Sequence, residues 1–237
     1  MKRHTYKMLF TLFSFLLLTG CASRVATSVD AIGSDDTLAQ KTYYLDSADI
    51  HIKSSDLQFK EYAKYIDWAM KQSGYSRTDI FENSNVTVFA SYEISDPQVT
   101  EYKYSIPIYG QTGVSSSTTY GSLNTIGNTG YYNATTYYTP TYGITGSTTH
   151  TGKRVDYIRR ITLTGMESST VGSSKGANVL WKISGTSIRT SGDLREIFPY
   201  MIISMSPYIG KNTGKSVEVI VQSDDKRLHD LGVNPSK

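Results

Sequence analysis

The chain has a single cysteine, Cys21, and its surroundings give that thiol a specific chemistry. Basic residues at the N-terminus precede an apolar run from Met8 to Leu18, which ends at Thr19-Gly20-Cys21. A basic start, a short apolar core and a small-residue exit are typical of a secretory signal peptide. The run is shorter than the ~20 apolar residues that a membrane-spanning helix needs. We therefore expect residues 1–20 to be a signal peptide that is removed.

The end of this segment resembles the lipobox of bacterial lipoproteins, with Leu18, Gly20 and Cys21 in the positions of that motif. The signal is then cut between Gly20 and Cys21, the thiol carries diacylglycerol, and the new amino group takes an acyl chain such as palmitate. The alternative is an ordinary secretory signal with a chance cysteine, but the one cysteine falls where the motif needs it. Ala22 and Ser23 follow, with no aspartate to act as an inner-membrane retention signal. We expect an outer-membrane anchor with the domain in the periplasm.

Residues that support metal or acid–base chemistry are few and scattered. The histidines at 4, 51, 150 and 229 are far apart and none pairs at helical spacing, so a metal site is unsupported. The stretch GKNTGKS at 210–216 imitates a phosphate-binding loop, but it is one residue short between its glycines and precedes a strand pattern. We read it as a helix-to-strand turn. We assign no catalytic residue and no cofactor, and enzymatic activity stays open because catalytic sets assemble from distant positions.

The net charge of the mature chain bears on which partners it can bind. The full chain has 24 Lys and Arg against 21 Asp and Glu, but Lys2, Arg3 and Lys7 leave with the signal peptide. The mature chain is then formally neutral and has no basic run, so nothing points to nucleic acid or to an anionic membrane held by charge alone. A secreted chain without a second thiol forms no internal disulfide, so a hydrophobic core has to supply its stability.

Two amphipathic helices are predicted. The first covers 56–73, with Ser55 as N-cap, Gln58 completing a capping box and Gly74 as the stop. Its apolar stripe consists of Phe59, Tyr62, Ala63, Ile66 and Met70. The second covers about 192–209 and contains Pro199, which predicts either a kink or a helix start near Phe198. Its stripe consists of Leu194, Ile197, Phe198, Met201, Ile202 and Met205. Such stripes are typical of core packing rather than of a ligand site.

Alternating apolar residues predict strands at 42–46, 86–92, 155–164, 178–184 and 216–222. The strand at 86–92 is apolar on both faces and is predicted to be central. The order of elements predicts an α+β fold, a single two-layer domain over 42–226 with a mixed sheet and two helices on one face. Residues 21–41 are small and polar, which predicts a flexible tether of roughly 25 Å. Residues 227–237 are predicted to be a polar tail.

Residues 97–153 differ in composition from the rest. Tyr, Thr, Ser and Gly dominate, and the pattern YGQTG from Tyr109 returns as YGITG from Tyr142. Tyr and Thr favour extended structure and Gly favours turns, so we predict an extended, hairpin-like insert. It is either a solvated decoration or a contact surface for a protein or glycan, because tyrosine offers rigid amphipathic contact area. The candidate contact residues are Tyr109, Tyr120, Tyr131, Tyr132, Tyr137, Tyr138 and Tyr142.

Several segments together resemble a family of bacterial lipoproteins catalogued only as a domain of unknown function. Beside the lipobox and the two Tyr-Gly segments, they are DLQFKEYAKYIDWAM from Asp56, SYEISDP from Ser91 and SGDLREIFPYM from Ser191. The chain departs from the family pattern at Glu93 and at Lys182-Ile183. The family implies a lipid-anchored periplasmic domain and has no agreed catalytic residues to transfer.

Two functions from different classes follow. The first is a non-catalytic structural or interaction module of the envelope. The second is an envelope enzyme, or a glycan- or peptidoglycan-binding protein that uses the Tyr-rich insert. The lack of any residue set with catalytic spacing favours the first. The expected partners are the membrane, through the lipid on Cys21, and an envelope protein or glycan.

Overall fold

The computed structural model describes residues 24–33, 41–174 and 176–233. Gly20, Cys21 and the signal peptide lie outside these residues, so the lipobox stays a prediction. Within the described residues, no helix is both long enough and apolar enough to cross a membrane. The described chain divides into two compact units. We call Val99–Val155 the hairpin unit, and the residues before and after it the body.

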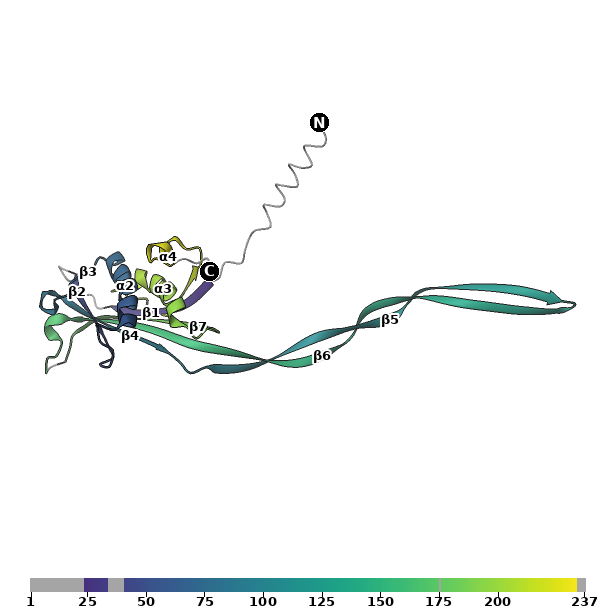
Figure 1. Ribbon diagram of the computed structural model, residues 1–237, viewed down its shortest axis with the longest axis horizontal. Helices are drawn as coiled ribbons and strands as arrows, with labels where there is room; N and C mark the ends of the chain where they lie inside the picture. Colours follow the sequence, from purple (N-terminus) through teal and green to yellow (C-terminus); the bar gives the residue numbers. More distant parts are fainter. Residues whose placement is uncertain (1–23, 34–40, 175, 234–237) are drawn as a thin grey trace, which may run out of the picture. The chain divides into compact units, whose positions relative to one another are not determined.

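The body is built on a mixed β-sheet with the strand order β3-β2-β4-β6-β7-β1-β8 (Figure 1). β2 pairs in parallel with β3 and β4, and the other neighbours pair antiparallel. The α+β class is confirmed at the level of a mixed sheet combined with helices. The strands are β1 (Arg24–Gly33), β2 (Thr42–Ser47), β3 (Ser76–Arg77), β4 (Val86–Ile94), β6 (Thr129–Glu167), β7 (Val179–Arg189) and β8 (Val217–Gln222).

One face of this sheet, the packed face, carries the core. The strand register places Ala90, Leu163 and Ile183 side by side on β4, β6 and β7, and Ala31 continues the row on β1. All four side chains are buried. Because side chains alternate along a strand, the residues between them point to the other face, where Thr162, for example, is only half-buried. The predicted central position of β4, between β2 and β6, is confirmed.

The first predicted helix is α2 (Leu57–Gln72). All five residues of its apolar stripe are buried, which confirms their assignment to the core. The predicted capping box is wrong. Asp56 and not Ser55 is the N-cap, it makes no side-chain cap hydrogen bond, and the Gln58 amide donates to the Tyr62 hydroxyl at 3.2 Å. With Asp56 as N-cap, Gln58 stands at the second helical position and not at the third, which a capping box requires.

The second predicted helix is α3 (Leu194–Met205), followed by the 3-10 turn η3 (Ser206–Tyr208). Asp193 is the N-cap, and its carboxylate accepts from the Arg195 amide at 2.8 Å. Because this cap holds the first turn, the helix begins before Pro199, and the alternative start near Phe198 is wrong. Every residue from Ile197 to Met205 is buried.

β1 corrects the tether predicted over 21–41. Arg24–Gly33 is a strand of the sheet, paired with β7 on one side and β8 on the other. Its inward side chains are Val25, Thr27, Val29 and Ala31, and all four are buried. Thr and Ala are weakly apolar, so the alternation is hard to recognise in the sequence. Only Ala22 and Ser23 separate Cys21 from this strand.

The described part of the polar tail predicted at 227–237 is also corrected. Lys226–Asp230 forms the helix α4, whose N-cap is Asp225. Leu228 is fully buried, and α4 contacts α3. A single apolar residue among charged neighbours gives too little periodicity to predict a helix, although it is enough to attach one turn to a core.

The hairpin unit consists of two long paired strands, β5 (Gln98–Ile126) and the first part of β6 (Figure 1). Gly127 and Asn128 form the two-residue turn between them. Gly127 has a φ of +63°, and no described residue other than glycine has a positive φ. A glycine with positive φ followed by a residue with negative φ is typical of a type II′ turn, which matches the twist of paired strands.

Candidate interaction surface

All seven candidate contact tyrosines lie on the hairpin unit and are exposed. Their exposed fractions run from 60% for Tyr131 to 73% for Tyr142. Exposed aliphatic residues accompany them on both strands, namely Ile108, Val114, Leu123, Ile126 and Ile144. Scattered exposed apolar residues are normal, whereas large exposed apolar patches are candidates for contact surfaces.

The two Tyr-Gly repeats lie against each other across the hairpin. The Thr112 hydroxyl donates to the Thr141 carbonyl at 3.3 Å, and the Thr145 hydroxyl donates to the Ile108 carbonyl at 3.2 Å. Thr145 also covers Gly110, and Thr112 covers Gly143, so the threonine of each repeat lies over the first glycine of the other. The two repeats in the sequence are therefore paired across the strands. A threonine side chain fills the space beside the first glycine of each repeat.

Aromatic rings strengthen the same ribbon. The Tyr132 ring occupies the space that a Cβ at Gly121 would need, and Tyr120 meets Tyr137 edge to face with ring centroids 6.1 Å apart. Rings that cover glycines and pair across strands stabilise a sheet. Some of the candidate tyrosines therefore hold the hairpin together and expose the rest of their surface.

A second aromatic cluster on this unit could not be recognised in the sequence. Tyr104 stacks on His150 with ring centroids 5.7 Å apart, and Tyr102 lies against Tyr104 at 6.0 Å. The strand register alone brings His150 to the two tyrosines. This register follows from the turn at Gly127-Asn128, and the composition of the insert does not locate that turn. The cluster is an exposed set of aromatic rings that carries hydroxyl and imidazole groups.

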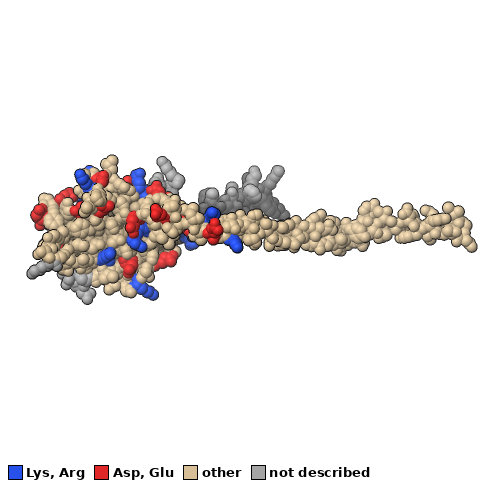
Figure 2. Space-filling model, turned by 90° about the horizontal axis from the view of Figure 1, so that it is seen from below, with Lys and Arg blue, Asp and Glu red and all other residues tan. Residues whose placement is uncertain are grey.

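Charge is absent from most of the hairpin unit. Between Lys103 and Lys153 the sequence contains no Lys, Arg, Asp or Glu. Figure 2 shows the corresponding surface without blue or red, in contrast to the body. Hydroxyl and amide side chains keep it polar. This surface can make hydrogen bonds and apolar contacts, but it offers almost no ion pairs to a partner.

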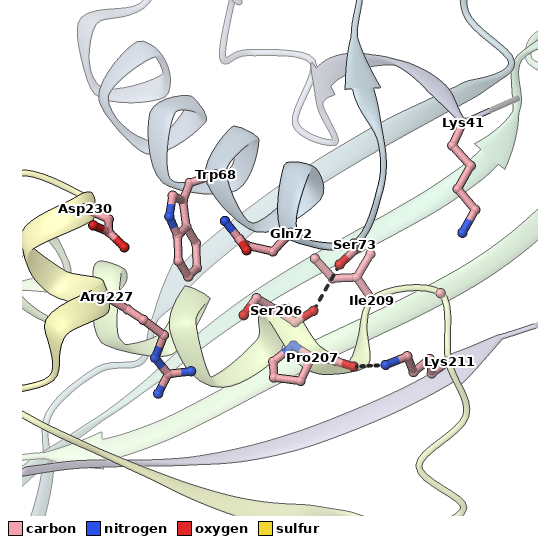
Figure 3. Close-up of a pocket in the computed structure, with 11 residues that line it drawn as sticks. Lys41, Trp68, Gln72, Ser73, Ser206, Pro207, Ile209, Lys211, Arg227 and Asp230 are labelled. Carbon is pink, nitrogen blue, oxygen red and sulfur yellow. Dashed lines mark hydrogen bonds between the residues drawn. The ribbon is translucent and has the colours of Figure 1, made fainter.

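The body has a surface pocket of about 500 Å³ near the end of α2, η3 and α4 (Figure 3). Trp68 forms part of an apolar wall. The lining also contains three cations, Lys41, Lys211 and Arg227, and one acid, Asp230. The excess of positive charge suits a small anion. This pocket could not be predicted from the sequence, because its residues come from segments that are far apart in the chain.

All three of these cations already have partners. The Lys41 ammonium lies over the Tyr75 ring, 5.2 Å from its centroid. Arg227 pairs with Asp225 at 2.6 Å, and the Lys211 ammonium donates to the Pro207 carbonyl at 2.8 Å. The pocket lining contains no nucleophile paired with a base. Among the described residues, no group of three or more His, Cys, Asp or Glu side chains is placed to hold a metal ion.

The segment that imitates a phosphate-binding loop, 210–216, connects η3 to β8, so its assignment to a helix-to-strand turn is confirmed. Its Thr213 exchanges hydrogen bonds with the backbone of Ala31 on β1, at 2.9 Å from its amide and 3.1 Å to its hydroxyl. The segment therefore fastens β1 to the loop and presents no helix N-terminus to a phosphate.

No protein-family model matches the chain, and no curated protein matches it. One similar solved structure is a PDZ domain protein from Parabacteroides distasonis, with a TM-score of 0.40 and 10% identity, over 91% of this chain and 43% of that one. Another is the lysenin pore, with a TM-score of 0.11 and 6% identity, over 85% of this chain and 50% of that one. The chain spans half or less of each, and likenesses of this size show neither fold nor function.

Proposed function

We propose that the protein is a lipid-anchored envelope protein that binds rather than catalyses, and that its hairpin unit is the binding surface. The observation that carries the proposal is the exposed, uncharged, tyrosine-rich ribbon between Lys103 and Lys153. Rigid aromatic side chains combined with small hydroxyl side chains are the composition of surfaces that bind proteins. Membership of the lipoprotein family of unknown function is part of the same proposal.

The anchor in this proposal is the lipid on Cys21, in the outer membrane with the body in the periplasm. The start of β1 at Arg24 supports a short attachment, since two residues separate it from Cys21. The Arg189 guanidinium donates to the Arg24 carbonyl, so two basic residues lie at the end of the sheet where β1 begins. Basic side chains close to a lipid attachment suit anionic headgroups.

We also propose the finer architecture, a two-layer body with both long helices on the packed face of the sheet. Tyr62 of α2 meets Tyr92 of β4 edge to face, with ring centroids 4.8 Å apart. Met205 of α3 lies against Gly185 of β7. Tyr62 also stacks on Phe198 of α3 at 3.9 Å, which ties the two helices together. In this description the insert is a hairpin-like extension of the sheet strand β6.

A glycan is the second candidate for the bound partner, and one observation favours it. The cluster of Tyr102, Tyr104 and His150 is exposed and carries hydroxyl and imidazole groups. Sugars bind to aromatic faces through their apolar side and to neighbouring polar groups through their hydroxyls. The envelope-enzyme alternative has no comparable support among the described residues.

The proposal is tested in cells by lipid labelling and fractionation. With Cys21→Ser, we expect no incorporation of labelled palmitate and an uncleaved precursor, because the thiol is both the lipid acceptor and the cleavage mark. The unchanged protein should fractionate with the outer membrane. A normally cleaved, unlabelled and soluble product would contradict the anchor, and recovery in the inner membrane would contradict the location.

The binding role is tested by cross-linking in intact envelopes. We expect the unchanged protein to give cross-linked products that disappear when Tyr104→Ser and Tyr138→Ser are combined, since both rings are exposed on the hairpin. The control is Ile50→Ser, at an exposed apolar residue of the body. Products that persist in the hairpin variant and vanish in the control would place the binding surface on the body. Isolated peptidoglycan that sediments the unchanged protein, but not the hairpin variant, would favour the glycan candidate.

A further inference from the structure

The hairpin unit has two open strand edges. β5 pairs only with β6. β6 in turn pairs with β4 and β7 only from Tyr157 to Glu167, which lies outside the hairpin unit. In an antiparallel ribbon, every second residue of each strand turns its amide and carbonyl outward. Along most of 99–155, both edges therefore carry rows of backbone donors and acceptors that no other strand of the described chain takes up.

The ribbon has few of the devices that normally keep such edges apart. Natural edge strands carry lysine or proline, are short, or are covered. Here β5 has 29 residues, and no charge occurs between Lys103 and Lys153. Only Pro107 and Pro140 interrupt the rows of donors in that stretch. A two-stranded ribbon is marginally stable in water by itself, and adding a strand at each edge is the usual way to stabilise it.

From these observations we infer that the hairpin units of neighbouring copies of this chain pair edge to edge, β5 of one copy against β6 of the next. β5 runs toward the Gly127-Asn128 turn and β6 runs away from it. Two hairpins placed side by side in the same orientation therefore bring β5 and β6 together antiparallel, as within one hairpin. Since neither strand carries charge between Lys103 and Lys153, identical copies meet there without like-charge repulsion.

A second copy fits this surface better than an unrelated partner does. The interaction is heterologous, so the same pair of edges repeats from copy to copy. The inference rests on the proposed lipid anchor in one respect, because copies held on one membrane share an orientation and a high local concentration. Exposed tyrosines on both strands would then form ladders across the joined ribbons, of the type already seen between Tyr120 and Tyr137.

The first test uses thiol cross-linking between two differently tagged copies in membranes. One carries Ser116→Cys on β5 and the other Thr139→Cys on β6. Both positions are exposed, and they lie level with each other along the hairpin, where the Ser115 hydroxyl donates to the Thr139 carbonyl. Cys21 is the only other cysteine and is blocked by lipid, and the unsubstituted chain controls for it. A short bismaleimide should give a product that carries both tags. Cross-links only to other proteins, or none, would overturn the inference.

The second test places charge on the open edges. Ser116→Lys combined with Thr149→Lys adds one lysine to each strand, and the matched control is Ser116→Gln with Thr149→Gln. We expect the lysine pair to weaken self-association of the full lipidated chain in detergent by roughly tenfold or more, measured by mass photometry, and the glutamine pair to leave it nearly unchanged. Circular dichroism checks that both variants are folded.

The outcomes separate this inference from the proposed function. A lipid-labelled protein that is monomeric in detergent and uncross-linked in membranes would overturn the pairing of hairpins and leave the anchor intact. A protein without lipid label that still forms the doubly tagged product would remove the anchor and keep the pairing. Equal weakening by the lysine and glutamine pairs would also overturn the inference, since it would show that charge at the edges is irrelevant.

Discussion

Arg159 has an unusual position for a charged residue. It lies on the packed face of β6, directly across from Ser187 on β7, and is fully buried. None of its three guanidinium nitrogens has a hydrogen-bond partner within the described part of the chain. Burial and the nearby Arg189 lower the pKa of this guanidinium. A buried charge without a partner costs free energy that the surrounding packing has to offset.

Arg159→Met should therefore raise the stability of the protein. Methionine keeps most of the volume and removes the desolvated charge, so we expect the free energy of unfolding to rise by about 1–3 kcal/mol. The neighbouring Arg160 is exposed and pairs with Glu93 at 3.3 Å, so Arg160→Met should change stability by less than about 1 kcal/mol. Urea denaturation measures both. A loss of stability in Arg159→Met would show that the guanidinium serves a bound anion.

Asp225 predicts a dependence on pH at the start of α4. Its carboxylate accepts from the Arg227 side chain and amide, which holds the pKa of Asp225 below its usual value. A carboxyl whose pKa is lowered by folding stabilises the fold above its unfolded pKa of ~3.9, and this contribution is lost as the pH falls through the folded value.

Asp225→Ala should lower stability at pH 7 by about 1 kcal/mol, because it removes a helix N-cap. The difference from the unchanged protein should narrow as the pH falls below ~3.9. Asp224 is the exposed neighbour and serves as the control, with an expected effect within about 0.5 kcal/mol for Asp224→Ala. A difference that stays constant from pH 7 to pH 3 would show that the charge of Asp225 does not contribute.

At the scale of elements, the sequence predicts the helices and strands whose buried face consists of large apolar side chains. The stripes of α2 and α3, and the alternation in β4 and β7, come from Phe, Ile, Met and Val, and these elements are where the sequence places them. β1 is missed because two of its buried residues, Thr27 and Ala31, are only weakly apolar. α4 is missed because Leu228 is its one buried apolar residue, and a single residue shows no periodicity. Their burial is decided by strand pairing and tertiary packing, which local periodicity does not encode.

The same distinction applies to the candidate surface. Composition alone points to the hairpin and to its seven tyrosines. The stack of Tyr104 on His150 depends on strand register, and the pocket near Trp68 depends on how separate segments come together. Neither the stack nor the pocket can be recognised from a short stretch of sequence.

β1 can be tested as an element of the core. Val29 is fully buried between β7 and β8, so Val29→Asp should lower the free energy of unfolding by about 3 kcal/mol or more. Ala26 points to the other face of the same strand and is exposed, so Ala26→Asp should cost less than about 1 kcal/mol. Chemical denaturation measures the difference. If the segment were a tether, both substitutions would be silent.

At the scale of the whole molecule, the division into two units separates the hydrophobic core from the proposed binding surface. The buried residues that form the hydrophobic core all lie in the body, and the hairpin unit contributes none of them. The ladder of β6 with β4 and β7 begins at Tyr157, after the hairpin unit ends. The hairpin should therefore be dispensable for folding of the body.

Replacing Gly110–Gly146 with an Asn-Gly turn tests this separation, because that dipeptide favours the short turn that the remaining strands need. We expect the body to melt in one cooperative transition within about 2 °C of the unchanged protein, while the cross-linked products in envelopes are lost. Met201→Asp is the opposite control, since it places an unpaired carboxylate among fully buried side chains and should abolish cooperative melting. A broad or missing transition in the shortened chain would mean that β5 and the hairpin part of β6 stabilise the sheet. The ribbon would then be a structural part of the fold, and the premise that its exposed tyrosines are free to bind a partner would fail.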